Sequence, residues 1–153
     1  MKKVIVISDT HGNTSGINKV VGSDFDYLFF LGDCVSDLGT LVNDPRVKVV
    51  RGNCDFFSAE KRDLIVQVED VLMFLTHGDE YGVKMTLSRL YDKVKELQPA
   101  LVLFGHTHRA EDVVYNGIRF VNPGALSSVR GGVNSYLVIN IDGDKYFIEK
   151  CTI

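Results

Sequence analysis

Residues 3–13 read KVIVISDTHGN, and this stretch decides how the rest of the chain is interpreted. The run VIVI is short, apolar and β-branched, which favours a buried strand over a helix. Asp9 and His11 follow directly, and Gly12 permits a tight turn after them. In an extended segment, residues two positions apart point to the same side, so this pair is able to grip one ion. The stretch predicts a strand with metal ligands at its carboxyl end.

The same pattern follows several other apolar runs. Asp33 follows a predicted strand Tyr27–Leu31, Asn53 follows Val47–Arg51, His77 follows Val71–Thr76, and both His106 and His108 follow Leu101–Phe104. All four histidines of the chain therefore lie in such turns. In open α/β sheets, ligands bind at the carboxyl ends of the strands, so we expect these side chains to meet at one rim.

The candidate metal ligands are too numerous for one tetrahedral zinc site, which takes four. They are Asp9, His11, Asp33, Asn53, His77, His106 and His108. They suit two ions that share a ligand, and the Asp33 carboxylate is the natural bridge. Two ions about 3.5–4 Å apart are able to hold a hydroxide and the oxygens of a phosphate. Mixed imidazole, carboxylate and amide ligands indicate two divalent transition-metal ions, with Mn favoured and Ni, Fe, Zn or Co as alternatives.

The other apolar runs complete an α/β domain over residues 1–153, with two packed mixed sheets flanked by helices. We predict further strands at Lys3–Ser8, Leu64–Val68, Asp112–Tyr115, Arg119–Asn122, Ser135–Ile141 and Lys145–Lys150, and helices at Thr14–Val21, Asp37–Val42 and Val83–Leu97. Asn116-Gly117 and Asp142-Gly143 predict tight hairpins, because these residues tolerate positive φ. Asn13 is expected to cap the first helix.

Composition and charge limit the partners and the cellular compartment that we expect for the protein. The net charge of −3 gives no reason to expect strong binding of duplex nucleic acid. The first apolar run is too short for a signal peptide, and no stretch is long enough to cross a membrane. Three cysteines without a Cys-x-x-Cys pair favour a reducing compartment, so we expect a cytoplasmic protein. The sequence leaves open whether the chain forms a homo-oligomer.

Taken together, the motifs resemble the calcineurin-like metallophosphoesterase superfamily, and most closely its small bacterial and archaeal phosphodiesterases. The matching motifs, in family order, are Asp9-x-His11, Gly32-Asp33, Gly52-Asn53-x-Asp55, His77-Gly78 and Gly105-His106-x-His108. The resemblance implies an αββα sandwich that hydrolyses a small phosphodiester substrate with a metal-activated hydroxide. It also implies one ion held by Asp9, His11, Asp33 and His108, and a second held by Asp33, Asn53, His77 and His106.

One position departs from the family pattern. Many members have Gly-Asn-His followed by an acid, and that histidine is thought to assist the leaving group, whereas this chain has Cys54. Asp33, Asn53 and Cys54 are thus the candidate catalytic residues, with general-acid help in doubt and good leaving groups favoured.

Several alternatives stay open. A non-catalytic interaction scaffold uses the same fold in the retromer subunit, and a phosphomonoesterase or nuclease would use the same ligands. Arg109 and Arg130 are candidates for binding substrate phosphate, or else ordinary surface arginines. Cys34 is expected to be a small core residue.

Overall fold

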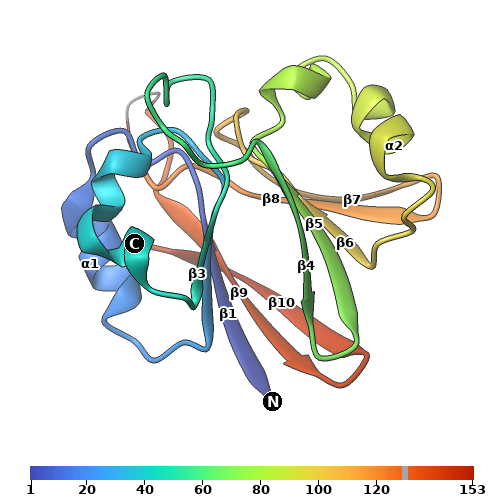
Figure 1. Cartoon of the computed structure of the whole chain (residues 1–153), viewed down its shortest axis with the longest axis horizontal. Coiled ribbons are helices and arrows are strands. Elements are labelled where there is room, and N and C mark those ends of the chain that lie inside the picture. The colour runs from blue at the N-terminus through green and yellow to red at the C-terminus, as the bar shows by residue number, and fades with distance from the viewer. Residues whose placement is uncertain (129–130) are drawn as a thin grey trace.

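The computed structural model describes residues 1–128 and 131–153, which form two five-stranded sheets packed face to face (Figure 1). Sheet A has the strand order β10-β9-β1-β2-β3, and sheet B has the order β4-β5-β6-β8-β7. The strands of sheet A are β1 (Lys2–Ile7), β2 (Tyr27–Phe30), β3 (Val47–Val49), β9 (Ser135–Asp142) and β10 (Lys145–Thr152). Those of sheet B are β4 (Asp63–Val68), β5 (Val71–Thr76), β6 (Leu101–Leu103), β7 (Ala110–Tyr115) and β8 (Ile118–Pro123). Every predicted strand is confirmed, with shifts only at the ends.

Parallel pairing at the centre of each sheet places the site. Strands β1, β2 and β3 are parallel to one another, and so are β5, β6 and β8. The outer strands of sheet B and the pair β9 and β10 run antiparallel to their neighbours. In each sheet, the carboxyl ends of several neighbouring strands therefore lie at the same edge.

Successive side chains of a strand point to opposite faces of its sheet. The buried strands therefore contribute to one core between the sheets and to two further cores under the helices. Val4 and Val6 of β1 pack between the sheets with Leu101 and Leu103 of β6. The alternate residues point outward, so that Ile5 and Ile7 pack against helix α1 (Thr14–Val21). On the far side, Val102 and Phe104 pack against helix α2 (Ser88–Val94). The layers are helix, sheet, sheet and helix, which confirms the expected αββα sandwich.

Two helix predictions were wrong in detail. The segment Asp37–Val42 lies in a 3₁₀ helix, η1 (Val35–Asn43), which is broken where Gly39 has a φ of 56°. The predicted helix Val83–Leu97 is α only over Ser88–Val94, and a short 3₁₀ turn η2 (Asp79–Tyr81) precedes it. Val83 is buried but Met85 is 90% exposed, so their spacing does not continue one apolar face.

Capping explains where α2 begins and ends. The Thr86 side chain accepts a hydrogen bond from the backbone N–H of Ser88, the first residue of the helix, while the N-cap residue Leu87 makes no side-chain cap. Gln98, with a φ of 49°, donates its backbone N–H to the Val94 carbonyl just before Pro99. The left-handed residue and the proline together stop the helix.

Of the two hairpin turns that were predicted, one lies at the expected residues and the other is shifted by one residue. Asn116 and Gly117 both have positive φ and join β7 to β8 in a two-residue turn, as expected. Asp142 instead remains paired with Lys145, so the turn between β9 and β10 consists of Gly143 and Asp144, and Gly143 has the positive φ. The three cysteines are free, and no helix within the described residues is long and apolar enough to span a bilayer.

Candidate metal centre

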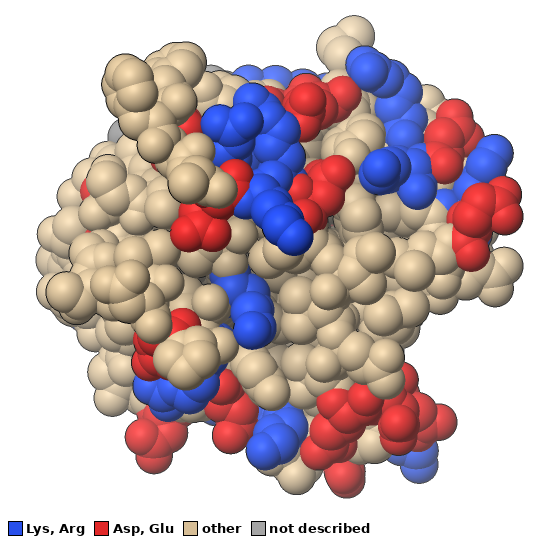
Figure 2. All heavy atoms as spheres, in the orientation of Figure 1, with Lys and Arg blue, Asp and Glu red and all other residues tan. Residues whose placement is uncertain are grey.

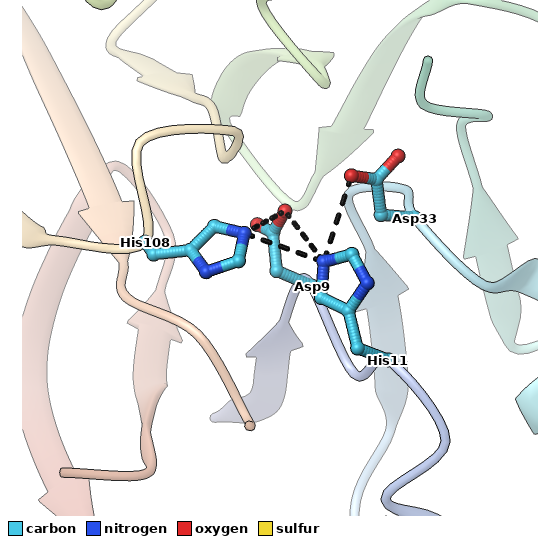
Figure 3. A group of neighbouring side chains, drawn as sticks. All are labelled: Asp9, His11, Asp33 and His108. Atoms are coloured by element: carbon cyan, nitrogen blue, oxygen red, sulfur yellow. Dashed lines mark hydrogen bonds and ion pairs between the residues drawn. The ribbon is translucent and has the colours of Figure 1, made fainter. Parts of the chain in front are cut away.

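The predicted ligands come together in the loops that follow five strands, three in sheet A and two in sheet B. The first group consists of Asp9, His11, Asp33 and His108, whose nearest donor atoms all lie within 4.8 Å of one another. Figure 3 shows both imidazoles and both carboxylates of this group turned toward a common centre. His11 Nε2 lies 3.3 Å from His108 Nε2, which lies 3.3 Å from Asp9 Oδ1.

A second group lies beside the first and shares Asp33 with it. Asp33, His77 and His106 have their donor atoms within 4.8 Å of one another. His77 Nε2 lies 3.4 Å from Asp33 Oδ2 and 3.2 Å from His106 Nδ1. The side-chain oxygen of Asn53 lies 3.0 Å from the same His77 nitrogen. The structure thus brings the candidate ligands together in two adjacent groups that have the Asp33 carboxylate in common.

The donor atoms suit divalent cations. Asp9 Oδ2 accepts hydrogen bonds from the Ser8 hydroxyl and the His106 backbone N–H, but the buried Oδ1 has no hydrogen-bond partner among the residues that the structure describes. His77 Nδ1 lies 2.7 Å from the Leu31 carbonyl, to which it donates its proton, so Nε2 faces the cluster. A buried carboxylate oxygen without a donor is costly unless a cation satisfies it.

Protonation in the metal-free protein is governed by His77 and Asp33. Burial alone would raise the pKa of Asp33, but the hydrogen bond and charge of His77 and the Cys54 backbone N–H hold it well below its usual range. Burial alone would lower the pKa of His77, yet the two carboxylates Asp33 and Asp9 raise it. Burial, together with the charge of His77, lowers the pKa of His106. Protons and cations therefore compete for His77 Nε2.

The backbone is strained at the same places. Five of the predicted ligands have positive φ, from 39° to 72°: Asp9, His11, Asp33, His106 and His108. Non-glycine residues in this region cost of order 1–3 kcal/mol each and cluster at functional sites. Gly105 shows how closely the loops approach, because a Cβ there would stand 2.8 Å from Asp9 Oδ2.

Asp55 fixes the Asp33 loop to the Asn53 loop, a role that the sequence analysis did not foresee. Its buried carboxylate accepts four backbone N–H groups at 2.8–2.9 Å, those of Asp33, Cys34, Val35 and Gly52. The motif Gly52-Asn53-x-Asp55 was the available signal, but only the folded contacts reveal what its last residue does. This carboxylate also begins η1 by binding its first N–H groups.

Asp37 holds the His11 loop in a similar way. Its carboxylate accepts hydrogen bonds of 2.7 Å from the Thr10 hydroxyl and from the Gly12 backbone N–H. Cys34 is not a core residue, contrary to expectation: it is half-buried, with a φ of 73°, and its Sγ lies 3.8 Å from His11 Nδ1. The turn after Asp33 directs the thiol toward the imidazole rather than into an apolar cluster.

The site opens to solvent through a cavity of about 140 Å³. Cys54 and Lys84 line it together with five of the predicted ligands, and sequence analysis had missed Lys84. Burial and the charge of Asp33 raise the pKa of Cys54 to about 11, so its thiol is neutral at ordinary pH. Arg109 is exposed and lines a neighbouring cavity with His108. Arg130 lies outside the described residues.

Asn13 has the role predicted for it. Its side chain caps α1 by accepting a hydrogen bond of 3.0 Å from the Gly16 backbone N–H.

Comparison with known proteins decides the family. The profile of the calcineurin-like phosphoesterase superfamily domain matches residues 1–144. The chain belongs to this superfamily. Among its members, the probable metallophosphoesterase YsnB of Bacillus subtilis is 30% identical over 92% of this chain and 85% of its own length. The superfamily implies divalent metal ions, and the histidine and aspartate groups described above are able to hold them.

Solved structures share the whole fold. A predicted phosphoesterase from Streptococcus pneumoniae superposes with a TM-score of 0.81 at 24% identity, covering 99% of this chain and 89% of that one. A structure described as a novel archaeal phosphodiesterase has a TM-score of 0.76 at 18% identity, covering 99% of both chains. Vps29 from Entamoeba histolytica, complexed with Zn²⁺, has a TM-score of 0.78 at 19% identity, covering 98% of both chains. At these sequence identities, the similarity to the three structures shows a shared fold.

Proposed function

We propose that the protein is a phosphodiesterase that uses two divalent metal ions. The observation that carries this proposal is the position of Asp33 in two adjacent groups of ligand atoms. One ion would be held by Asp9, His11, Asp33 and His108, and the other by Asp33, Asn53, His77 and His106. When bound, such ions activate water for attack on phosphorus and stabilise the charge on the phosphate oxygens. We further propose a small diester as the substrate and the cytoplasm as the compartment.

The chain's own side chains would orient the substrate. Lys84 is exposed at the mouth of the cavity and offers a cation to a non-bridging phosphate oxygen. The Cys54 backbone N–H holds Asp33 Oδ1 at 3.0 Å, which leaves Oδ2 directed at both ligand groups. The Cys54 thiol keeps its proton because its pKa is raised to about 11, which makes it a poor proton donor to a leaving group.

The surroundings favour a diester over a monoester. One cavity of about 370 Å³ shares Cys54 with the metal site, and another of about 390 Å³ shares His108. A phosphorus atom held between them has space for two ester arms. The archaeal phosphodiesterase of the same fold supports this choice. On the face drawn in Figure 2, acidic and basic side chains are interspersed, which is unlike a continuous basic surface for duplex nucleic acid.

The proposal is tested on protein stripped with a chelator and reloaded with Mn²⁺. Metal content is measured by elemental mass spectrometry, and hydrolysis of bis(p-nitrophenyl) phosphate is compared with that of p-nitrophenyl phosphate. We expect two ions per chain and faster hydrolysis of the diester. Faster hydrolysis of the monoester would favour the phosphomonoesterase.

A metal-bearing scaffold is the second candidate function. The likeness to Vps29 supports it, and so do two fully or largely exposed aromatic side chains beside the site, Phe56 and Phe57. A scaffold would bind the ions without turnover. Metal loading without hydrolysis of either ester would therefore favour this candidate.

A further inference from the structure

The loop after β3 presents an aromatic pair to solvent. Phe56 is 80% exposed and Phe57 is 102% exposed, although both follow Asn53 and Cys54 by only a few residues. In Figure 1 this loop stands at the upper edge of the molecule, and the same region of Figure 2 is an uncharged protrusion at the upper left. These two rings add little buried apolar area to the core, because their faces remain in water.

The loop is held in place at its base. Asp55, between the ligand Asn53 and the two rings, is buried and accepts four backbone N–H groups. The Asp55 carbonyl accepts the Ser58 N–H, and the Arg51 N–H reaches the Lys61 carbonyl at 2.9 Å. The backbone that carries the rings is thus tied to the loops of the metal site, so little ordering of the backbone would be needed on binding.

A cavity of about 370 Å³ lies between this loop and the start of η1. Phe56, Phe57 and Val35 contribute apolar surface to it, and no Lys or Arg is among the described residues that line it. Its volume lies within the range of small-ligand sites. Cys54 lines both this cavity and the one at the metal site, so the two are adjoining.

We infer that this cavity binds a flat aromatic group, a nucleobase or an aryl ring, on one ester arm of the phosphodiester. The inference rests on the proposed function, because the metal site would hold the phosphate to which that arm is attached. The absence of lysine and arginine disfavours a second phosphate, whereas exposed phenylalanine faces suit stacking. Stacking of one base on an aromatic side chain typically changes affinity by about tenfold.

Binding tests the inference without turnover. The Mn²⁺-loaded protein is titrated by calorimetry with AMP, phenyl phosphate and ribose 5-phosphate, which share a phosphate but differ in their rings. We expect at least one aromatic ligand to bind about tenfold more tightly than ribose 5-phosphate. The double variant Phe56→Ala/Phe57→Ala should lose this preference, and Phe147→Ala, which removes another exposed ring on β10, should keep it. Tighter binding of AMP alone would identify a nucleobase, and tighter binding of phenyl phosphate alone an aryl ring.

Hydrolysis supplies an independent measurement. The double variant should reduce kcat/KM for bis(p-nitrophenyl) phosphate by about tenfold at unchanged metal content, because either aryl arm reaches the cavity. Equal affinities for the three phosphates in the wild type, or an unchanged kcat/KM in the double variant, would overturn the inference, as expected if the rings instead dock a protein partner. Absence of hydrolysis in the wild type would contradict the proposed function, and calorimetry would still decide the inference.

Discussion

Asp33 combines several unusual properties in one side chain. It has a φ of 67°, its carboxylate is buried, and its Oδ1 and Oδ2 face different partners. The charge of His77 and the Cys54 N–H lower its pKa despite burial. Such a carboxylate is ionised at all working pH values and gains most from a nearby cation. We therefore expect substitution of Asp33 to affect metal binding more than folding.

Replacement of Asp33 should therefore be severe. We expect Asp33→Asn and His108→Ala each to reduce hydrolysis of an activated aryl phosphodiester by at least about a hundredfold, because each removes a proposed ligand. Asp112→Asn is the control, since it breaks only an ion pair with Arg119 on sheet B. Initial rates are compared at matched metal loading. Rates like those of the wild type in both site variants would remove the two-metal proposal.

Cys54 allows the role of a general acid to be measured. Its thiol is exposed, so an imidazole has space there, and its raised pKa makes the native group a weak acid. We expect Cys54→His to raise the rate for alkyl phosphodiesters relative to aryl ones, because an imidazolium with a pKa near ~6.5 donates a proton more readily. Cys54→Ser controls for loss of the thiol. An unchanged alkyl-to-aryl ratio, with metal content verified, would rule out this role.

At the scale of elements, the Asp55 carboxylate joins the turn after β2 to the turn after β3. In Asp55→Asn, one oxygen becomes an NH₂ group that faces backbone N–H donors instead of accepting from them. Loss of charged hydrogen bonds should lower the free energy of unfolding by about 2–3 kcal/mol and weaken metal binding. Urea unfolding of the metal-free protein measures the first effect. Asp92→Asn, at an exposed ion pair with Lys95, should change little, and equal stability of both variants would contradict the argument.

The strands were predictable because their apolar residues alternate or run together without polar interruption. The turns after them were predictable because Gly, Asp, Asn and His directly after an apolar run indicate a turn. The N-terminal end of α2 was not, because Val83 and Met85 are both apolar but only Val83 is buried. The bonds of Asp55 and the nearness of Lys84 to the ligands depend on loops distant in sequence. No local pattern encodes such contacts, although the residues themselves stand in or near the motifs.

At the scale of the molecule, the metal centre spans both sheets. Asp9 and His11 follow a strand of sheet A, whereas His77 and His108 follow strands of sheet B. Direct contacts join these loops, among them the His106 N–H to Asp9 Oδ2 at 3.1 Å and His77 Nδ1 to the Leu31 carbonyl at 2.7 Å, and both candidate ligand groups draw on loops of both sheets. Bound ions would therefore act as cross-links between the sheets, and their removal should affect stability as well as activity.

We expect a strong chelator to abolish hydrolysis, with Mn²⁺ or another transition metal restoring it better than Mg²⁺, because imidazole ligands disfavour Mg²⁺. Each bound ion should stabilise the fold by about 2.7 kcal/mol at a free concentration about 100-fold above its Kd. Thermal unfolding with and without metal measures this, and His77→Ala/His108→Ala should show a smaller increase in Tm. Full activity with Mg²⁺ alone, after verified removal of other metals, would count against the ligand assignment.

The position of β1 in sheet A has a consequence for how the protein is made. Asp9 and His11 follow this strand, yet one of its two neighbours is β9, which begins at Ser135. During translation, the first ligands emerge long before sheet A acquires its last strands. The loop with Asp9 and His11 therefore acquires this neighbouring strand only after residues 135–142 have been synthesised. Ions that need the complete sheet A for tight binding would bind after this point, and the supply of each metal at that time would then influence which form accumulates.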